Sequence, residues 1–289
     1  MTFDLNAVDS AAAFLIDFNV ADVPAAVGLE ATPAAAAAMY GVTPEQFAAY
    51  AGAVAAEVEA EARRLLDDPA LGAAVEAFPV APGGRLLFIG DSITTYRRSY
   101  ARLLEAMLQA RRPADRITVV NGGRSGFTSS HGIELTYVKF LGLDPNLVTV
   151  GFGGNDCKRF GDDDHGRGRL LVDPRAYREN LAGIVDAFRR HTSARVVVVG
   201  PTPVIPARIA ANPDFAASRV RWDMADLLAC NDTARKVAAE RGLTFVDQMQ
   251  ALGEAPDPRL YLADGLHPGP AGHVIMLRAL LRAVVPGAL

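Results

Sequence analysis

Residues 85–92 read Arg-Leu-Leu-Phe-Ile-Gly-Asp-Ser, an apolar run that ends abruptly at Gly90, Asp91 and Ser92. A short, continuous apolar run of this kind predicts a strand that is buried on both faces, as in a parallel sheet. Gly90 allows the backbone to turn sharply where the strand ends. Ser92 is therefore expected at the carboxyl end of a strand, where open α/β sheets bind ligands, and it is either a nucleophile or a helix cap.

Short apolar runs of this kind recur along the rest of the chain, with helical segments between them. Four further strands are predicted, at 117–120, 147–152, 195–199 and 243–246. Helices are predicted between and after them, near 98–110, 131–141, 174–191, 223–241 and 271–285. Strands that alternate with helices form right-handed βαβ units. We therefore predict an α/β fold with three α/β/α layers, in which a flavodoxin-like, parallel five-stranded sheet carries an added N-terminal helical segment.

The chain before the first predicted strand is rich in alanine and indicates helices only. Thr43, Pro44 and Gln46 form a helix start signal, because threonine can cap, proline suits the first turn and glutamine can complete a capping box. That helix is expected to end near Leu66, and Asp68 begins another. With 79–84 as a linker, we predict a helical segment at 1–80 and an α/β domain at 81–289.

Composition excludes several classes of protein. The formal net charge of −4 over 289 residues offers no attraction to nucleic acid or to anionic membranes. Cys157 and Cys230 are the only cysteines, which argues against a disulfide framework and against a cysteine zinc site. We see neither a signal peptide nor a stretch suited to stable membrane insertion, so the sequence favours a cytoplasmic protein.

Polar and glycine-rich residues follow the predicted strands and should gather at one edge of the sheet. Ser92 follows the first strand, a glycine-rich segment at 121–128 the second, and Asn155 the third. Asp264 stands three residues before His267, just ahead of the last predicted helix. A serine, a histidine, an aspartate and glycine-rich turns are the parts that acyl transfer by a serine nucleophile needs.

Each of these residues can be given a chemical role. A serine hydroxyl is a poor nucleophile until a base takes its proton; histidine is the usual side chain for that task, so His267 is the candidate base. Asp264 can hold the other ring nitrogen. The oxyanion that forms on the attacked carbonyl needs preorganised donors, for which the backbone N–H groups of Ser92 and Gly126 and the side-chain amide of Asn155 are candidates.

The chain resembles the SGNH hydrolase superfamily, also called the GDSL-type esterases and lipases. The resemblance rests on four blocks in the family's order: Gly90-Asp91-Ser92, Asn121 with Ser125-Gly126-Phe127-Thr128, Gly153-Gly154-Asn155-Asp156, and Asp264 to His267. It assigns the catalytic roles to Ser92, Asp264 and His267, and the oxyanion hole to Ser92, Gly126 and Asn155. Phe127 departs from the family pattern, and Gly123 is a second glycine that can share the oxyanion role.

The resemblance implies an esterase that hydrolyses a small-molecule ester through an acyl-serine intermediate and needs no cofactor or metal. An acyltransferase would use the same residues. A non-catalytic binding protein on this fold, with the helical segment as its interaction surface, is the alternative from another class. A flavodoxin-like nucleotide binder lacks the expected phosphate-binding spacing. The N-terminal helices are a possible surface for homo-oligomer formation.

Other residues near these blocks are assigned structural roles. The run 162–165, Asp-Asp-Asp-His, is expected to be a solvated loop instead of a metal site. Cys157 is expected to be a small buried residue, and His273 to be packed in its helix or exposed. His131 follows two serines and carries no assignment.

Substrate specificity is expected to come from the loops after the strands, here 161–170 and 201–221. The second loop contains four apolar residues, namely Val204, Ile205, Ile209 and Phe215. These side chains either line an acyl pocket or serve in ordinary packing, and the sequence does not separate the two.

Overall fold

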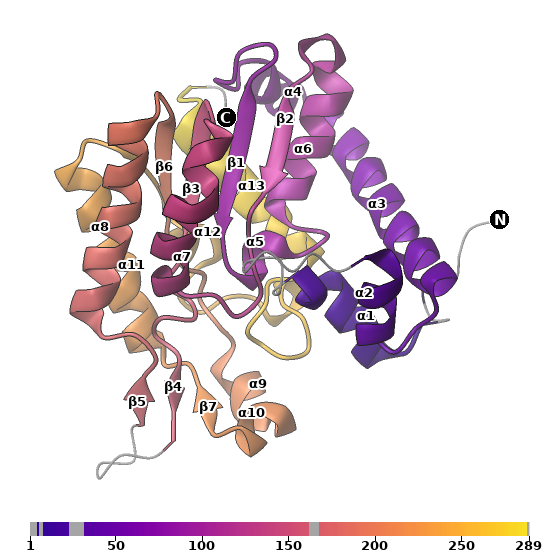
Figure 1. The fold of residues 1–289 in the computed structure, drawn as a ribbon, viewed down its shortest axis with the longest axis vertical. Coiled ribbons are helices and arrows are strands. Elements are labelled where there is room, and N and C mark those ends of the chain that lie inside the picture. The colour runs from indigo at the N-terminus through magenta and orange to yellow at the C-terminus, as the bar shows by residue number, and fades with distance from the viewer. Residues whose placement is uncertain (1–4, 6–7, 23–31, 162–167, 288) are drawn as a thin grey trace.

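The computed structural model describes residues 5, 8–22, 32–161, 168–287 and 289. Its centre is a parallel sheet of five strands, namely β1 (Arg85–Gly90), β2 (Thr118–Asn121), β3 (Leu147–Gly151), β6 (Arg195–Val199) and β8 (Thr244–Val246). Their order across the sheet is β2-β1-β3-β6-β8 (Figure 1). This is the flavodoxin-like, doubly wound order, so the predicted fold class is confirmed.

The apolar run of β1 divides its side chains between the two faces of the sheet. Leu86 and Phe88 pack with α6 (Tyr100–Arg111) and α13 (Pro270–Val284) on one face. Leu87 and Ile89 pack with α8 (Pro174–His191) and α11 (Met224–Glu240) on the other. Helices cover both faces (Figure 1), which explains why the strand is apolar throughout instead of alternating.

The predicted helices of this part are present with small changes at their ends. The predicted helix at 131–141 is in fact α7 (Ser129–Leu135) followed by a π-helical turn over Thr136–Phe140. It begins earlier because Thr128 and His131 cap it. Two short helices, α5 (Ser92–Thr95) and α12 (Gln248–Leu252), complete the layers. Within the described residues no helix is long and apolar enough to cross a membrane.

The N-terminal part is helical, as predicted, and has an apolar cluster of its own. It contains α1 (Ser10–Asp17), α2 (Pro33–Met39), α3 (Pro44–Leu66) and α4 (Pro69–Glu76). The capping box at the start of α3 is confirmed, since Thr43 Oγ1 accepts from the N–H of Gln46 at 3.1 Å and Gln46 Oε1 accepts from the N–H of Thr43 at 3.0 Å. Ile16 of α1 and Tyr50 of α3 are buried in the shared cluster.

A second, small antiparallel sheet was not predicted. It consists of β4 (Arg159–Phe160), β5 (Arg169–Leu170) and β7 (Val220–Arg221), in the order β5-β4-β7. The segment expected to be a long loop at 201–221 also forms α9 (Pro206–Ala211) and α10 (Pro213–Ala217). Strands of two residues show no sequence period, because their pairing is set by contacts with distant parts of the chain.

His273 on α13 is packed, one of the two predicted outcomes, and is only 1% exposed. Its Nδ1 accepts a hydrogen bond from the N–H of Tyr100 at 3.2 Å, and its ring lies against those of Tyr96 and Tyr100. Burial, with a smaller contribution from the charge of His267, lowers the pKa of His273 to about 3. The folded protein therefore keeps this imidazole neutral under conditions in which the unfolded chain protonates it.

We expect His273 to make the fold sensitive to mild acid. Because an unfolded histidine titrates near pH 6.5, the free energy of unfolding should fall as the pH drops below that value, by about 2 kcal/mol at pH 5. The free energy of unfolding is measured in urea at pH 7.5 and at pH 5. Its decrease between the two pH values should be about 2 kcal/mol smaller for His273→Gln than for the wild type. His191→Gln, at the exposed end of α8, is the matched control. Equal losses in wild type and His273→Gln would contradict the assignment.

Candidate active site

Ser92 lies on the turn between β1 and α5, and neighbouring groups fix that turn. Asp91 caps α5, since its Oδ1 accepts a hydrogen bond from the N–H of Ile93 at 3.0 Å. A Cβ atom at Gly90 would lie 2.6 Å from the carbonyl oxygen of Gly151 on the adjacent strand, so only glycine fits there. The turn therefore presents the partly exposed Ser92 at the carboxyl edge of the sheet.

His267 and Asp264, on the loop before α13, complete a hydrogen-bonded chain with Ser92. The Oγ of Ser92 lies 2.9 Å from Nε2 of His267, although the two residues are 175 positions apart. Nδ1 of His267 lies 2.6 Å from Oδ2 of Asp264. Oδ1 of Asp264 accepts from the backbone N–H groups of Leu266 at 2.9 Å and of His267 at 3.0 Å. The structure thus joins the three residues that the sequence nominated for catalysis.

The surroundings of Asp264 keep its carboxylate ionised. Burial by itself would raise the pKa of Asp264. The hydrogen bond and charge of His267, together with the N–H groups of His267 and Leu266, outweigh burial and leave the pKa below its usual value. A buried carboxylate in this state can fix the tautomer of the imidazole and stabilise the imidazolium that forms when His267 accepts a proton.

Two backbone N–H groups, those of Ser92 and Gly126, are candidates for binding an oxyanion. That of Ser92 is at the first position of α5, where a helix offers no internal acceptor. Gly126 adopts a φ of +79°, which favours glycine, and its N–H bonds to no residue that the structure describes. Gly123, which was expected to share this role, donates its N–H to Oδ1 of Asn121 at 3.0 Å. Gly126 is therefore the better candidate of the two glycines.

Asn155 lies on the turn after β3, against the turn that carries Ser92. A Cβ atom at Gly154 would be 3.3 Å from Oδ2 of Asp91, which shows how closely the two turns approach. The amide nitrogen of Asn155 donates to the carbonyl oxygen of Phe127 at 3.1 Å. An amide has two N–H bonds, so this contact orients the group and leaves one donor for a substrate oxygen.

Asp156 is a residue of this site to which the sequence analysis assigned no role. Its Oδ1 accepts from the N–H of Ser129 at 3.0 Å and from Oγ of Ser129 at 2.5 Å, and its Oδ2 accepts from the N–H of Gly153 at 3.1 Å. Burial outweighs these hydrogen bonds and raises the pKa of Asp156. The carboxyl ties the start of α7 to the turn that carries Asn155. Its position in the Gly-Gly-Asn-Asp block was the sequence feature that could have indicated this role.

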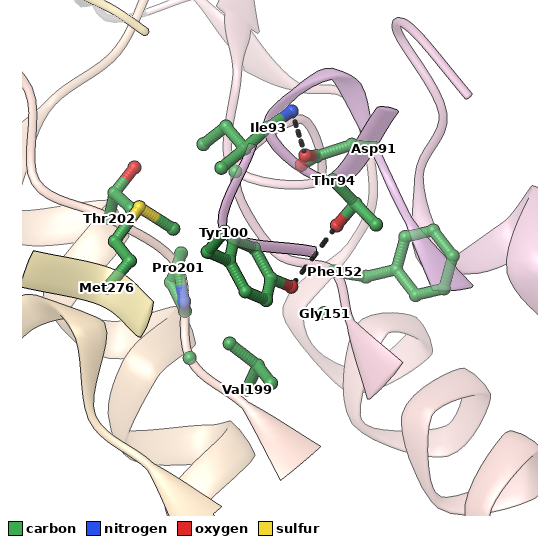
Figure 2. A pocket seen from close by; sticks show the side chains of 12 residues that line it. Asp91, Ile93, Thr94, Tyr100, Gly151, Phe152, Val199, Pro201, Thr202 and Met276 are labelled. Carbon is green, nitrogen blue, oxygen red and sulfur yellow. Dashed lines mark hydrogen bonds between the residues drawn. The ribbon is translucent and has the colours of Figure 1, made fainter. Parts of the chain in front are cut away.

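A small cavity is lined in part by Asp91, Ile93 and Thr94, the neighbours of Ser92 in the chain (Figure 2). Its volume of about 20 Å³ is room for about one water molecule. Asp91, Tyr100 and Met276 are among the residues that line it, whereas Ser92 and His267 are not. Burial raises the pKa of Asp91 to about 6, against the opposing effects of the Ile93 N–H and of His267. Because the cavity has room for only about one water molecule and neither catalytic side chain lines it, it is not the substrate site.

Two phenylalanines from the N-terminal part contact the imidazole of His267. The ring of Phe18 lies 4.4 Å from that of His267, centre to centre, and Phe14 lies 5.9 Å from it, edge to face. Phe18 also stacks on Tyr96 at 4.8 Å. Neither phenylalanine was predicted at the site, because their spacing along α1 is typical of any helix that packs on one face.

Other side chains near the site have structural roles, as far as the structure describes them. Cys157 is 1% exposed, and hydrogen bonding to Cys230 together with burial raises the pKa of its thiol, which argues against a thiolate nucleophile. His131 caps α7 through Nδ1, which lies 3.1 Å from the N–H of Thr128. The acidic run at 162–165 lies outside the described residues.

The apolar residues of the 201–221 segment are used in packing. Val204 and Ile209 are buried in a cluster with Trp222, and Phe215 packs against its edge. Ile205 belongs to the buried cluster that includes residues of α6 and α13. Of the two expectations for this segment, the structure favours ordinary packing over an open acyl pocket.

Comparisons with known proteins place this geometry in a family. Residues 88–275, more than half of the chain, match the GDSL-like Lipase/Acylhydrolase family. An acetylxylan esterase of Geobacillus stearothermophilus is 26% identical over 223 residues, which cover 71% of this chain and 95% of that protein.

Solved structures show the same fold. LAE5, an α/β hydrolase enzyme from the metagenome of Lake Arreo in Spain, is 26% identical, covers 72% of this chain and 98% of its own, and has a TM-score of 0.56. Axe2, an acetylxylan esterase of Geobacillus stearothermophilus, is 24% identical, covers 73% and 98%, and has a TM-score of 0.57. The predicted resemblance is confirmed: this chain belongs to the GDSL-like lipase/acylhydrolase family and is a hydrolase of ester bonds.

Proposed function

We propose that this protein is a serine esterase that removes short acyl groups, foremost acetyl, from a hydroxylated small molecule such as a sugar, with Ser92 as the nucleophile. The observation that carries the proposal is the continuous hydrogen-bonded chain from Ser92 Oγ through the imidazole of His267 to the carboxylate of Asp264. A serine hydroxyl with a base at 2.9 Å and an ionised carboxylate behind that base is equipped for acyl transfer.

In the first half of the reaction Ser92 Oγ attacks the ester carbonyl while Nε2 of His267 takes its proton. The carbonyl oxygen becomes an oxyanion, which the N–H groups of Ser92 and Gly126 and the amide of Asn155 stabilise. Each such donor contributes about 10²- to 10³-fold to kcat in enzymes of this kind. His267 then gives the proton to the leaving alcohol, and the acyl group stays on Ser92.

In the second half a water molecule replaces the alcohol. His267 takes a proton from the water, whose oxygen attacks the acyl-serine carbonyl, and the same donors hold the second oxyanion. Return of the proton to Ser92 Oγ releases the carboxylic acid. All of these steps use groups that the chain itself supplies.

A short acyl group is favoured by the packing around the site. The apolar side chains best placed in sequence to hold a long chain, Val204 and Ile209, are 1% and 4% exposed and enclosed in a core cluster. The indole of Trp222 closes over the Asn155 turn, where its Nε1 donates to the carbonyl oxygen of Gly154 at 2.9 Å. The curated relative is an acetylxylan esterase, which supports acetylated sugars as the substrate class.

An acyl-chain series tests the proposal. With 4-nitrophenyl acetate, butyrate and octanoate, kcat/KM should fall at least about tenfold from acetate to octanoate, because the described apolar residues of 201–221 are enclosed in the core instead of open to the added methylenes. Acetate release from an acetylated xyloside should accompany activity on the nitrophenyl acetate. Octanoate hydrolysis as fast as acetate hydrolysis would contradict the short-acyl proposal and point to a lipase.

The cellular setting and assembly are further proposals. A cytoplasmic location stays a prediction of the sequence analysis. Homo-oligomer formation through the N-terminal helices stays a prediction. Met39, 52% exposed on α2, is a candidate contact for it.

A further inference from the structure

The N-terminal part reaches the active site although it lies outside the family match. That match begins at residue 88, and the curated relative covers 71% of this chain but 95% of its own length. Yet Phe14 of α1 and Phe18, which follows it, contact the ring of His267. One side of the catalytic histidine is therefore covered by a segment that the family pattern does not include.

Backbone and side-chain groups of this segment attach it to the residues that follow Ser92. The carbonyl oxygens of Ile16 and Asp17 accept from Nε and from the backbone N–H of Arg97, at 2.9 and 2.8 Å. The Asp17 carboxylate pairs with Arg98 at 2.7 Å. The amide of Asn19 donates to the carbonyl oxygen of Thr95 at 2.8 Å.

A further contact joins the segment to the loop that carries Gly126. Oγ of Ser125 donates to the carbonyl oxygen of Phe18 at 2.5 Å. The segment is thus bonded on both sides of the site, to the residues that follow Ser92 and to the residue that precedes Gly126. These bonds hold the backbone that carries the two phenyl rings beside His267.

The two rings differ in their exposure, and this difference separates their roles. Phe18 is 2% exposed, between Tyr96 and His267, and can only support the imidazole. Phe14 is 41% exposed and lies 4.6 Å from Phe18 and 5.9 Å from His267, measured between ring centres. An exposed phenyl ring at the edge of a catalytic imidazole is a surface that a bound substrate can cover.

The chemistry decides which part of the substrate would lie there. His267 must bring its proton to the oxygen of the leaving alcohol, so the group that sits beside His267 is the alcohol part of the ester. We propose that Phe14 is a specificity-determining residue for that alcohol, and that it packs against the flat C–H face of a ring alcohol such as a pyranose. The inference rests on the proposed esterase function and deepens it.

Two acetates that differ only in their alcohol test the proposal. Cyclohexyl acetate and ethyl acetate form the same acetyl-enzyme, so a difference between their kcat/KM values reports on the alcohol. In the full-length protein, Phe14→Ala should lower kcat/KM for cyclohexyl acetate about three- to tenfold, the usual contribution of a contact with an aromatic ring. The value for ethyl acetate should change less than twofold. An acetylated xyloside should follow cyclohexyl acetate.

The controls separate recognition from folding and from the proposed function. Phe14→Trp should keep the preference for the ring alcohol, and Tyr137→Ala, at a side chain 56% exposed that packs near the end of α8 at His191, should leave both values unchanged. Equal loss on both acetates, or no loss on either, would overturn the role of Phe14. If neither acetate is hydrolysed in a Ser92-dependent way, the esterase function itself fails; if only the xyloside resists, the sugar assignment fails while cyclohexyl acetate still decides the role of Phe14.

Discussion

Replacing Ser92 by alanine is expected to lower kcat for 4-nitrophenyl acetate by about 10⁴-fold or more, with no loss of folding stability. The physical reason is that the acyl group can no longer be transferred to the enzyme, so the reaction loses its covalent route. His267 and the oxyanion donors remain and can still promote direct attack by water, which sets the residual rate. The measurements are steady-state hydrolysis and the burst of nitrophenol in the first turnover, which should disappear.

Ser193→Ala is the matched control, because this exposed serine lies between α8 and β6, at the edge of the sheet opposite the site. It should retain wild-type activity. A fluorophosphonate probe should label the wild type and Ser193→Ala but not Ser92→Ala. If Ser92→Ala kept a tenth of the activity, Ser92 would be only the first residue of α5, and the serine mechanism would be wrong.

The sequence predicted the sheet and the triad because both leave strong local signals. The buried strand at 85–89 is a continuous apolar run, and the turn residues after it, Gly90 and Ser92, have residue types that the geometry demands. Asp264 and His267 are three residues apart, so their mutual contact is set by local chain geometry. Their meeting with Ser92 follows from the strand order, since the ends of parallel strands share one edge.

The contribution of α1 to the site could not be predicted in the same way. Phe14 and Phe18 reach His267 because hydrogen bonds from Arg97 and Ser125 hold the backbone of this segment against the α/β part of the structure. Such contacts join distant parts of the chain and leave no period or motif. The small sheet that includes β4 was missed for the same reason, as its two-residue strands are defined only by their partners.

Asp264→Asn is expected to lower kcat by about 10⁴-fold while leaving the backbone of the loop in place. In the wild type, Oδ1 of Asp264 accepts from the N–H groups of Leu266 and His267, and Oδ2 faces Nδ1 of His267. Asparagine can accept from the N–H groups of Leu266 and His267 only if its side-chain oxygen takes the place of Oδ1. Its NH₂ group then donates to Nδ1, which forces the proton of the imidazole onto Nε2, and Nε2 can no longer accept the proton of Ser92.

The pH dependence separates this tautomer effect from a general loss of structure. Since the pKa of Asp264 lies below its usual value of 3.8, the wild-type carboxylate stays ionised above about pH 5, so protonation of Asp264 itself should not reduce the deficit of Asp264→Asn between pH 6 and pH 8. The same depressed pKa means that ionised Asp264 stabilises the fold at neutral pH and that this stabilisation is lost in acid. Asp264→Asn should therefore have a slightly lower free energy of unfolding at pH 7, to be measured beside kcat.

Asp214→Asn, at an exposed position of α10, is the matched control. A fall in the kcat of Asp264→Asn of less than about tenfold would show that His267 adopts the required tautomer without Asp264.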